Sequence, residues 1–98
     1  MPYFVEIRVN PDYESVPKGA RDRHIAFLDA HIDLILAGGG LWDDDGLAIH
    51  GGFYILDIED RARAEQIVAQ DPYLTEKVFE IVQITRWRKA YFNHKRLI

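Results

Sequence analysis

The sequence predicts an α+β protein of the ferredoxin-like type, in which an antiparallel sheet carries two helices on one face. Three observations lead to this class. The first and last segments alternate between apolar and polar residues as strands do, two intervening stretches have helical spacing, and glycine-rich or proline-containing turns separate them. The resulting order is β-α-β-β-α-β, within one small domain that spans residues 1–98.

The first strand is predicted over residues 3–9, where Tyr3, Val5, Ile7 and Val9 share one face. A turn at Pro11 ends this strand, and an irregular loop follows over residues 13–19. A helix is then expected over residues 20–37, because apolar residues recur at helical spacing from Ile25 to Leu36. Gly38, Gly39 and Gly40 are interpreted as the cap that ends this helix.

The second half of the chain repeats the pattern. A short strand begins at Leu41-Trp42, an acidic turn follows over residues 43–46, and an apolar third strand is expected over residues 52–58, central in the sheet. The second helix is predicted over residues 61–70 and ends at Asp71-Pro72, because the residue before proline is disfavoured in the α region. A short turn or helical step over residues 73–77 leads into the last strand, residues 78–87.

Composition excludes several classes of protein. The chain has no cysteine, which removes disulfides, thiolate nucleophiles and cysteine-bound zinc, and fits a cytoplasmic location. A net charge of −4 argues against a nucleic-acid partner. Neither a signal peptide nor an apolar run long enough to span a bilayer is visible, so no membrane association is expected. Phe4, Tyr54, Leu56 and residues 90–92 are expected to be exposed in a monomer, which favours a homodimer.

The candidate site is a pair of residues from opposite halves of the chain. His24 borders the apolar stripe near the start of the first helix, and Asp71 ends the second helix. In the predicted topology both positions lie at the same end of the molecule. Imidazole titrates near neutrality, and a carboxylate bonded to one ring nitrogen fixes its tautomer, so the pair suits proton transfer. Asp71 is expected at the C-terminal end of a helix dipole, which disfavours an anion.

The same end of the molecule holds other candidates. Substrate contacts are assigned to Arg21, Arg23, Tyr73 and His50. The acidic residues Asp43–Asp45 together with His50 could bind a divalent cation, although their spacing is not that of a calcium loop and a solvated turn is favoured; no metal or cofactor is therefore predicted. His31 is expected to be structural, and Ser15 has no neighbouring base that would make it a nucleophile.

Five short motifs together resemble the YCII-like family. They are Arg23-His24-x-x-Phe27-Leu28, Gly38-Gly-Gly-Leu41, Gly51-Gly52, Asp71-Pro72-Tyr73 and a closing Trp87. The resemblance implies a dimeric ferredoxin-like fold of the α+β barrel type, with a His–Asp pair in a cleft, carried here onto His24 and Asp71. The residues 43–50 depart from the family pattern, in which many relatives have a shorter turn with a Gly-Pro pair.

Two functions of different classes are consistent with these residues. The resemblance implies a cofactor-independent lyase that performs proton transfer on a small ring-containing substrate, with dehydrochlorination of a chlorinated hydroxyhydroquinone in aromatic degradation as the specific expectation. The alternative is a non-catalytic module of the same fold, which binds a small ligand in the same cleft and dimerises. The residues alone do not name the substrate.

Overall fold

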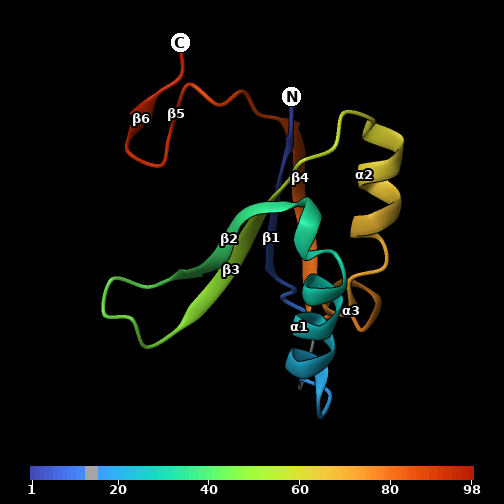
Figure 1. Ribbon diagram of the computed structural model, residues 1–98. Helices are drawn as coiled ribbons and strands as arrows, with labels where there is room; N and C mark the ends of the chain where they lie inside the picture. Colours follow the sequence, from blue (N-terminus) through green and yellow to red (C-terminus); the bar gives the residue numbers. More distant parts are fainter. Residues whose placement is uncertain (13–15) are drawn as a thin grey trace.

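Four antiparallel strands form the sheet of the computed structural model, which describes residues 1–12 and 16–98 (Figure 1). The strands are β1 (Tyr3–Val9), β2 (Ile35–Trp42), β3 (Ile49–Leu56) and β4 (Phe79–Arg86). Their order in the sheet is β2-β3-β1-β4. The predicted ferredoxin-like class and the central position of the third strand are therefore confirmed.

Short helices cover one face of this sheet (Figure 1). They are α1 (Ala20–Ala30), the single 3-10 turn η1 (Ile32–Leu34), α2 (Arg61–Val68) and α3 (Pro72–Thr75). Asp60 caps α2 by accepting a hydrogen bond from the backbone N–H of Ala62, as expected for aspartate at this position. The short helical step predicted after Pro72 is present as α3. Within the described part of the chain, no helix has the length and apolar character required to cross a bilayer.

The core lies between the sheet and these helices. Tyr3, Val5 and Ile7 are buried on the helix-facing side of β1, as their alternation predicts. Tyr54 and Leu56 are also buried there, because β1 pairs with β3 in a register that places Tyr54 opposite Val5 and Leu56 opposite Tyr3. The prediction that these two residues are exposed is therefore wrong. The opposite face instead carries the stacked rings of Phe4 and Phe53, with centroids 5.5 Å apart.

The first helix is shorter than predicted. It ends at Ala30, and the residues that follow form η1 and then β2, so the interpretation of the glycine run as a helix cap is wrong. The glycine run pairs with β3 instead: Gly38, Gly39 and Gly40 lie opposite Tyr54, Phe53 and Gly52. This pairing gives the backbone N–H and C=O groups of the glycines their hydrogen-bond partners. A Cβ on Gly38 would lie only 3.0 Å from the Cβ of Tyr54, so glycine permits the close approach of these strands.

The remaining boundaries differ from the prediction by a few residues. β3 begins at Ile49 and ends at Leu56, and α2 ends at Val68. The pairing of β1 with β4 shifts between Glu6 and Ile7, so the strict alternation predicted along the last strand is interrupted by an irregularity. The predicted loop over residues 13–19 includes residues 13–15, among them Ser15, which lie outside the described residues.

An exposed ion pair ties α1 to the C-terminal end of α3. Arg23 donates from Nε to Glu76 at 2.9 Å and forms a second bond through its terminal nitrogen. These hydrogen bonds, together with the positive charge of Arg23, lower the pKa of Glu76 below its ordinary value of 4.5. At neutral pH the pair therefore holds α1 and α3 together, the two helices beside the candidate site.

This ion pair gives a pH-dependent prediction. A carboxylate whose pKa is lowered in the folded state stabilises the fold above its unfolded pKa, and this contribution is lost as the pH falls through the folded pKa. We expect the urea midpoint of the wild-type protein to exceed that of Glu76→Gln at neutral pH, and the difference to shrink below pH 4.5 and to vanish once the pH falls below the lowered pKa of Glu76. A difference that is unchanged in acid would contradict this role for Glu76.

Candidate active site

Two distant residues meet where α1 and α3 lie side by side. His24 lies in the second turn of α1, and Asp71 lies in the connection between α2 and α3, 47 positions later in the sequence. The Nδ1 of His24 is 2.7 Å from the Oδ1 of Asp71. The contact that the topology predicts is therefore present in the structure.

Asp71 is the only charged residue among the described residues that is fully buried, with 0% of its surface exposed. Its Oδ1 also accepts a hydrogen bond of 2.9 Å from the backbone N–H of Tyr73, and its Oδ2 accepts one of 3.3 Å from the hydroxyl of Tyr54. Three donors thus converge on one carboxylate, which satisfies a buried anion. Asp71 follows the end of α2, where its backbone N–H donates to the carbonyl of Val68, and it also caps the N-terminus of α3, the end of a helix that favours an anion.

Tyr54 holds Asp71 from the sheet side. Burial raises the pKa of Tyr54 above its ordinary value of 10, and the negative charge of Asp71 raises it further. The hydroxyl therefore keeps its proton throughout the physiological range and remains a donor to the carboxylate. Tyr54 was not identified from the sequence, because its place in the sheet was assigned to the exposed face.

The hydrogen bond to Asp71 fixes the tautomer of His24. A carboxylate oxygen accepts but does not donate, so Nδ1 carries the hydrogen, and the neutral ring leaves Nε2 with a free lone pair. Nε2 has no hydrogen-bond partner among the described residues, and none of their unpartnered side-chain nitrogens or oxygens is buried. The His24 side chain, 14% exposed, thus presents an accessible nitrogen that can accept a proton.

Aromatic stacking holds the imidazole ring in place. The rings of His24 and Tyr73 stack with centroids 4.0 Å apart and an interplanar angle of 12°. Tyr73 in turn stacks on Phe79 at 4.8 Å. With Nδ1 bonded to Asp71 and one ring face covered by Tyr73, the imidazole has little freedom to rotate. A fixed imidazole is the arrangement that acid/base catalysis requires.

His24 lies on the wall of a cavity of about 430 Å³, a size suited to one small ring-containing molecule. The side chains of α1 form one wall, and the helix-facing side of the sheet forms the floor. Glycines dominate that floor, and at Gly40 an added side chain would meet Trp42 and Ile49, which line the same cavity. The floor and the open end are lined by Gly38, Gly39, Gly40, Gly51, Gly52, Trp42 and Ile49.

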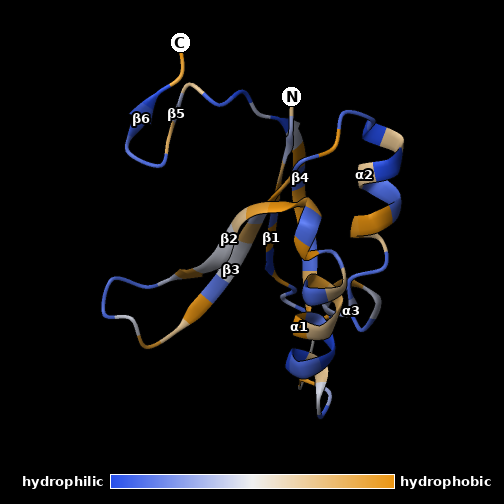
Figure 2. Ribbon diagram, in the orientation of Figure 1, coloured by the Kyte–Doolittle hydropathy of each residue, from blue (hydrophilic) through white to orange (hydrophobic). Residues whose placement is uncertain are grey.

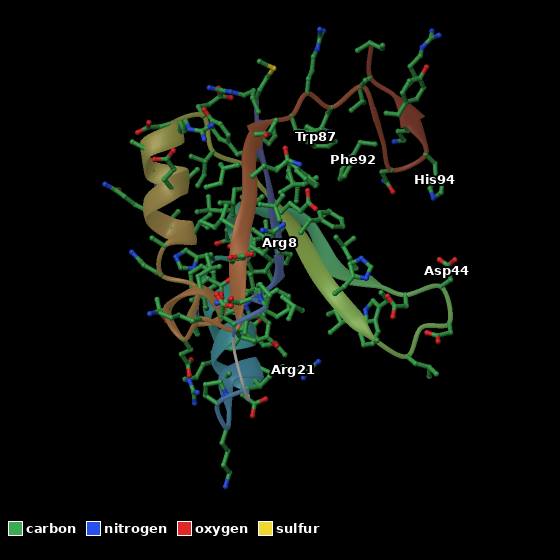
Figure 3. All side chains as sticks on the ribbon, turned by 180° about the vertical axis from the view of Figure 1, so that it is seen from behind. Arg8, Arg21, Asp44, Trp87, Phe92 and His94 are labelled. Atoms are coloured by element: carbon green, nitrogen blue, oxygen red, sulfur yellow. The ribbon has the colours of Figure 1, made fainter. Side chains whose placement is uncertain are left out.

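Two of the four predicted substrate contacts line this cavity. Arg21 and Tyr73 lie beside His24, and the positive charge of Arg21 acts to lower the pKa of Tyr73 while burial raises it, the net direction being upward. Arg23 is bonded to Glu76 and His50 lies 3.2 Å from Asp43, and neither lines the cavity. Figure 3 shows Arg21 at one end of the molecule and Asp44 at the end of the β2–β3 hairpin. Glu76 at the end of α3 thus holds Arg23, and Asp43 in the connection between β2 and β3 holds His50.

The hypothesis of a divalent cation at residues 43–45 and His50 receives no support. No group of three or more histidine or acidic side chains within residues 1–12 and 16–98 has the geometry to hold a metal ion. Asp45 instead accepts a hydrogen bond from the backbone N–H of Leu47, and Asp43 is paired with His50. These contacts are those of a solvated turn. His31 bonds through Nδ1 to the carbonyl of Phe27, consistent with a structural role.

Fold and site together define a class of small ferredoxin-like α+β proteins, with one cleft between sheet and first helix and an imidazole–carboxylate pair on its wall. Within that class, the chain belongs to the YCII-related domain family, whose sequence model matches residues 1–88.

Comparison with solved structures finds a similar fold in 5-chloro-2-hydroxyhydroquinone dehydrochlorinase (TftG) from Burkholderia phenoliruptrix AC1100, in complex with 2,5-dihydroxybenzoquinone. The TM-score is 0.63 and the sequence identity is 22%, over 88% of this chain and 93% of that chain. At this identity the match concerns the fold. No curated protein matches the sequence.

Proposed function

We propose that this protein is a cofactor-independent lyase that uses His24 as a general base on a small ring-containing substrate, and that its reaction is the dehydrochlorination of a chlorinated hydroxyhydroquinone. The observation that carries the proposal is the 2.7 Å contact between His24 and buried Asp71 on the wall of the cavity. The dehydrochlorinase activity named for the structurally similar TftG supports the reaction type.

The proposed chemistry needs only proton transfer. Nε2 of His24 removes a proton from a ring hydroxyl, and the negative charge of Asp71 stabilises the imidazolium that forms. The imidazolium returns the proton to the chlorine-bearing carbon, which gives the keto tautomer. Loss of a second hydroxyl proton then expels chloride and leaves a quinone. The substrate loses one H⁺ and one Cl⁻, and the ring supplies both electrons of the departing chloride, so no external oxidant is required.

Arg21 and Tyr73 are assigned to substrate binding. A ring hydroxyl that loses its proton becomes an anion, and Arg21 brings a positive charge to the same cavity. Tyr73 covers one face of His24, and its own ring borders the space that a planar substrate occupies. The glycine floor leaves room for such a flat molecule against the sheet.

The alternative function is a non-catalytic module that binds a small ligand in the same cavity. One observation favours it: Asp71 accepts hydrogen bonds from Tyr73 and Tyr54 in addition to His24, so it contributes to the fold as well as to the pair. Under this alternative the ligand is bound and released unchanged, and Asp71 serves only to hold the helices against the sheet.

The direct test is turnover of 5-chloro-2-hydroxyhydroquinone under anaerobic conditions, because the substrate oxidises in air. We expect stoichiometric release of chloride and formation of the hydroxyquinone, both faster than in the protein-free control. Saturable binding of the quinone product without any chloride release would favour the binding module.

The glycine floor gives a prediction about binding. A Cβ at Gly40 would lie 2.7 Å from Nε1 of Trp42 and 2.8 Å from Cδ1 of Ile49, so Gly40→Ala must displace these two side chains at the open end of the cavity. Since both are partly exposed, they can move without disrupting the sheet. We expect the affinity for 2,5-dihydroxybenzoquinone, followed by quenching of tryptophan fluorescence, to fall about tenfold, with little loss of stability.

The neighbouring glycine provides a matched control. A Cβ at Gly39 would meet nothing within 4 Å, and strand alternation points it to the opposite face of the sheet. Gly39 borders the cavity only through its backbone, so Gly39→Ala is expected to bind the quinone as the wild type does. If both variants lose affinity equally, the glycines act through the conformation of the strand backbone, and the shape of the cavity floor is not the cause.

A further inference from the structure

The C-terminal segment forms a hairpin that stands away from the sheet (Figure 1). β5 (Tyr91–Phe92) pairs with β6 (Lys95–Arg96), and we call residues 87–98 the tail hairpin. Figure 3 shows Trp87, Phe92 and His94 along this segment. The match to the family model ends at residue 88, so nearly all of the tail hairpin lies beyond the part of the chain that the family defines.

The tail hairpin has a defined conformation but little to pack against. Its two-residue turn places Asn93 and His94 at φ of 53° and 62°, the left-handed region that matches the twist of a tight hairpin. Phe92 meets Trp87 edge-on at 6.3 Å, whereas Tyr91 is 68% exposed. A hairpin with two paired residues in each strand is at best marginally stable alone in water. The geometry therefore points to a second surface that the tail hairpin covers.

A second arm projects from the same side of the molecule as the tail hairpin (Figure 1). It is the β2–β3 hairpin, whose end we call the acidic tip, residues 43–45, all three of them exposed aspartates. Apolar side chains flank it: Leu47 is 82% exposed, and Trp42 and Ile49 are also exposed. This arm thus combines negative charge with unburied apolar surface.

The two arms are complementary in charge and in apolar character. Figure 2 shows hydrophilic residues at both the acidic tip and β6. The acidic tip carries three negative charges. The tail hairpin carries four positive charges, on Arg88, Lys89, Lys95 and Arg96. Exposed Tyr91 and Leu97 can cover the apolar residues beside the tip. Among the described residues, no hydrogen bond or ion pair joins the two arms of one chain, and β5 and β6 pack mainly against each other.

We propose that the tail hairpin of each protomer docks on the acidic tip of a second copy of this chain. A two-fold axis that places each tail hairpin on the partner's tip forms the same contact twice. Since Trp42 and Ile49 also line the cavity, a docked tail hairpin covers its open end. The partner then completes the wall of the site, and the cavity is closed to water only in the dimer.

Charge reversal tests this contact. The tail variant is Lys95→Glu with Arg96→Glu, and the tip variant is Asp44→Lys with Asp45→Lys. Each variant alone places like charges at both copies of the contact, so we expect its dimer dissociation constant, measured by sedimentation velocity, to rise about tenfold to a hundredfold. The effect should shrink at high salt. Lys18→Glu with Arg63→Glu lowers the net charge as much as the tail variant does, but away from both arms, and should leave dimerisation unchanged.

Mixing the two variants provides the decisive measurement. In a heterodimer the reversed tail meets the reversed tip, and the native tail meets the native tip, so both contacts are attractive again. We expect the equimolar mixture to recover wild-type dimerisation. A monomeric wild type, unaltered dimerisation of either variant, or a mixture that stays monomeric would each overturn the proposal. Binding of the tail hairpin to nucleic acid or a lipid surface instead predicts no recovery on mixing.

Discussion

Replacing His24 with alanine is expected to lower kcat for the chlorinated hydroxyhydroquinone by about 10²- to 10⁴-fold, the usual contribution of a positioned acid/base group. The variant removes the only imidazole that lines the cavity among the described residues, while Asp71 keeps its donors Tyr73 and Tyr54. The buried carboxylate therefore stays hydrogen-bonded, and the fold should persist. Chloride release under single-turnover conditions, with circular dichroism as a check of the fold, provides the measurement.

The matched control for this variant is His31→Ala. His31 lies one residue beyond the same helix and bonds only to the carbonyl of Phe27, outside the cavity. It should turn over as the wild type does. Partial recovery of the His24→Ala variant by added imidazole would support the role of a general base, because a free base can enter the emptied position. Wild-type turnover by His24→Ala would remove the catalytic proposal.

That His24 and Asp71 lie at the same end of the molecule could be predicted from the topology, and the structure adds the contact between their side chains. Once the strand order is fixed, the start of the first helix and the end of the second must lie at the same end of the sheet, and both residue types favour such boundaries. The short connection at Pro72 then leaves Asp71 few directions to face. Contacts of this kind depend on where helices and strands begin and end. Turn residues and hydrophobic periodicity in the sequence indicate these positions.

The floor of the cavity could not be predicted in the same way. A run such as Gly38–Gly40 fits a helix cap and a strand equally well in local terms, and only pairing with β3 decides between them. Tyr54 was misplaced for a related reason, since an apolar strand gives no alternation to show which face is buried. The ion-pair partner of an exposed side chain is equally hard to predict from the sequence. Arg23 pairs with Glu76, a carboxylate that lies 53 positions away.

Replacing Asp71 with alanine is expected to destabilise the fold by about 3–5 kcal/mol, because it leaves the buried hydroxyl of Tyr54 and the N–H of Tyr73 without their acceptor. Asp29→Ala, which removes an exposed carboxylate from α1, is the control and should cost less than about 0.5 kcal/mol. Urea denaturation at neutral pH measures both. A loss as small as that of the control would contradict the structural role.

The isosteric variant Asp71→Asn separates stability from catalysis. Its amide oxygen can replace Oδ1, which serves both His24 and Tyr73, while its NH₂ group takes the place of Oδ2. The hydroxyl of Tyr54 can rotate to accept from that NH₂, so every polar group keeps a partner and the stability loss should be clearly smaller than for alanine. What the amide lacks is the negative charge that stabilises an imidazolium, so kcat should fall steeply although the fold survives. If this variant instead keeps full turnover, the carboxylate serves the fold alone and the pair is no catalytic unit.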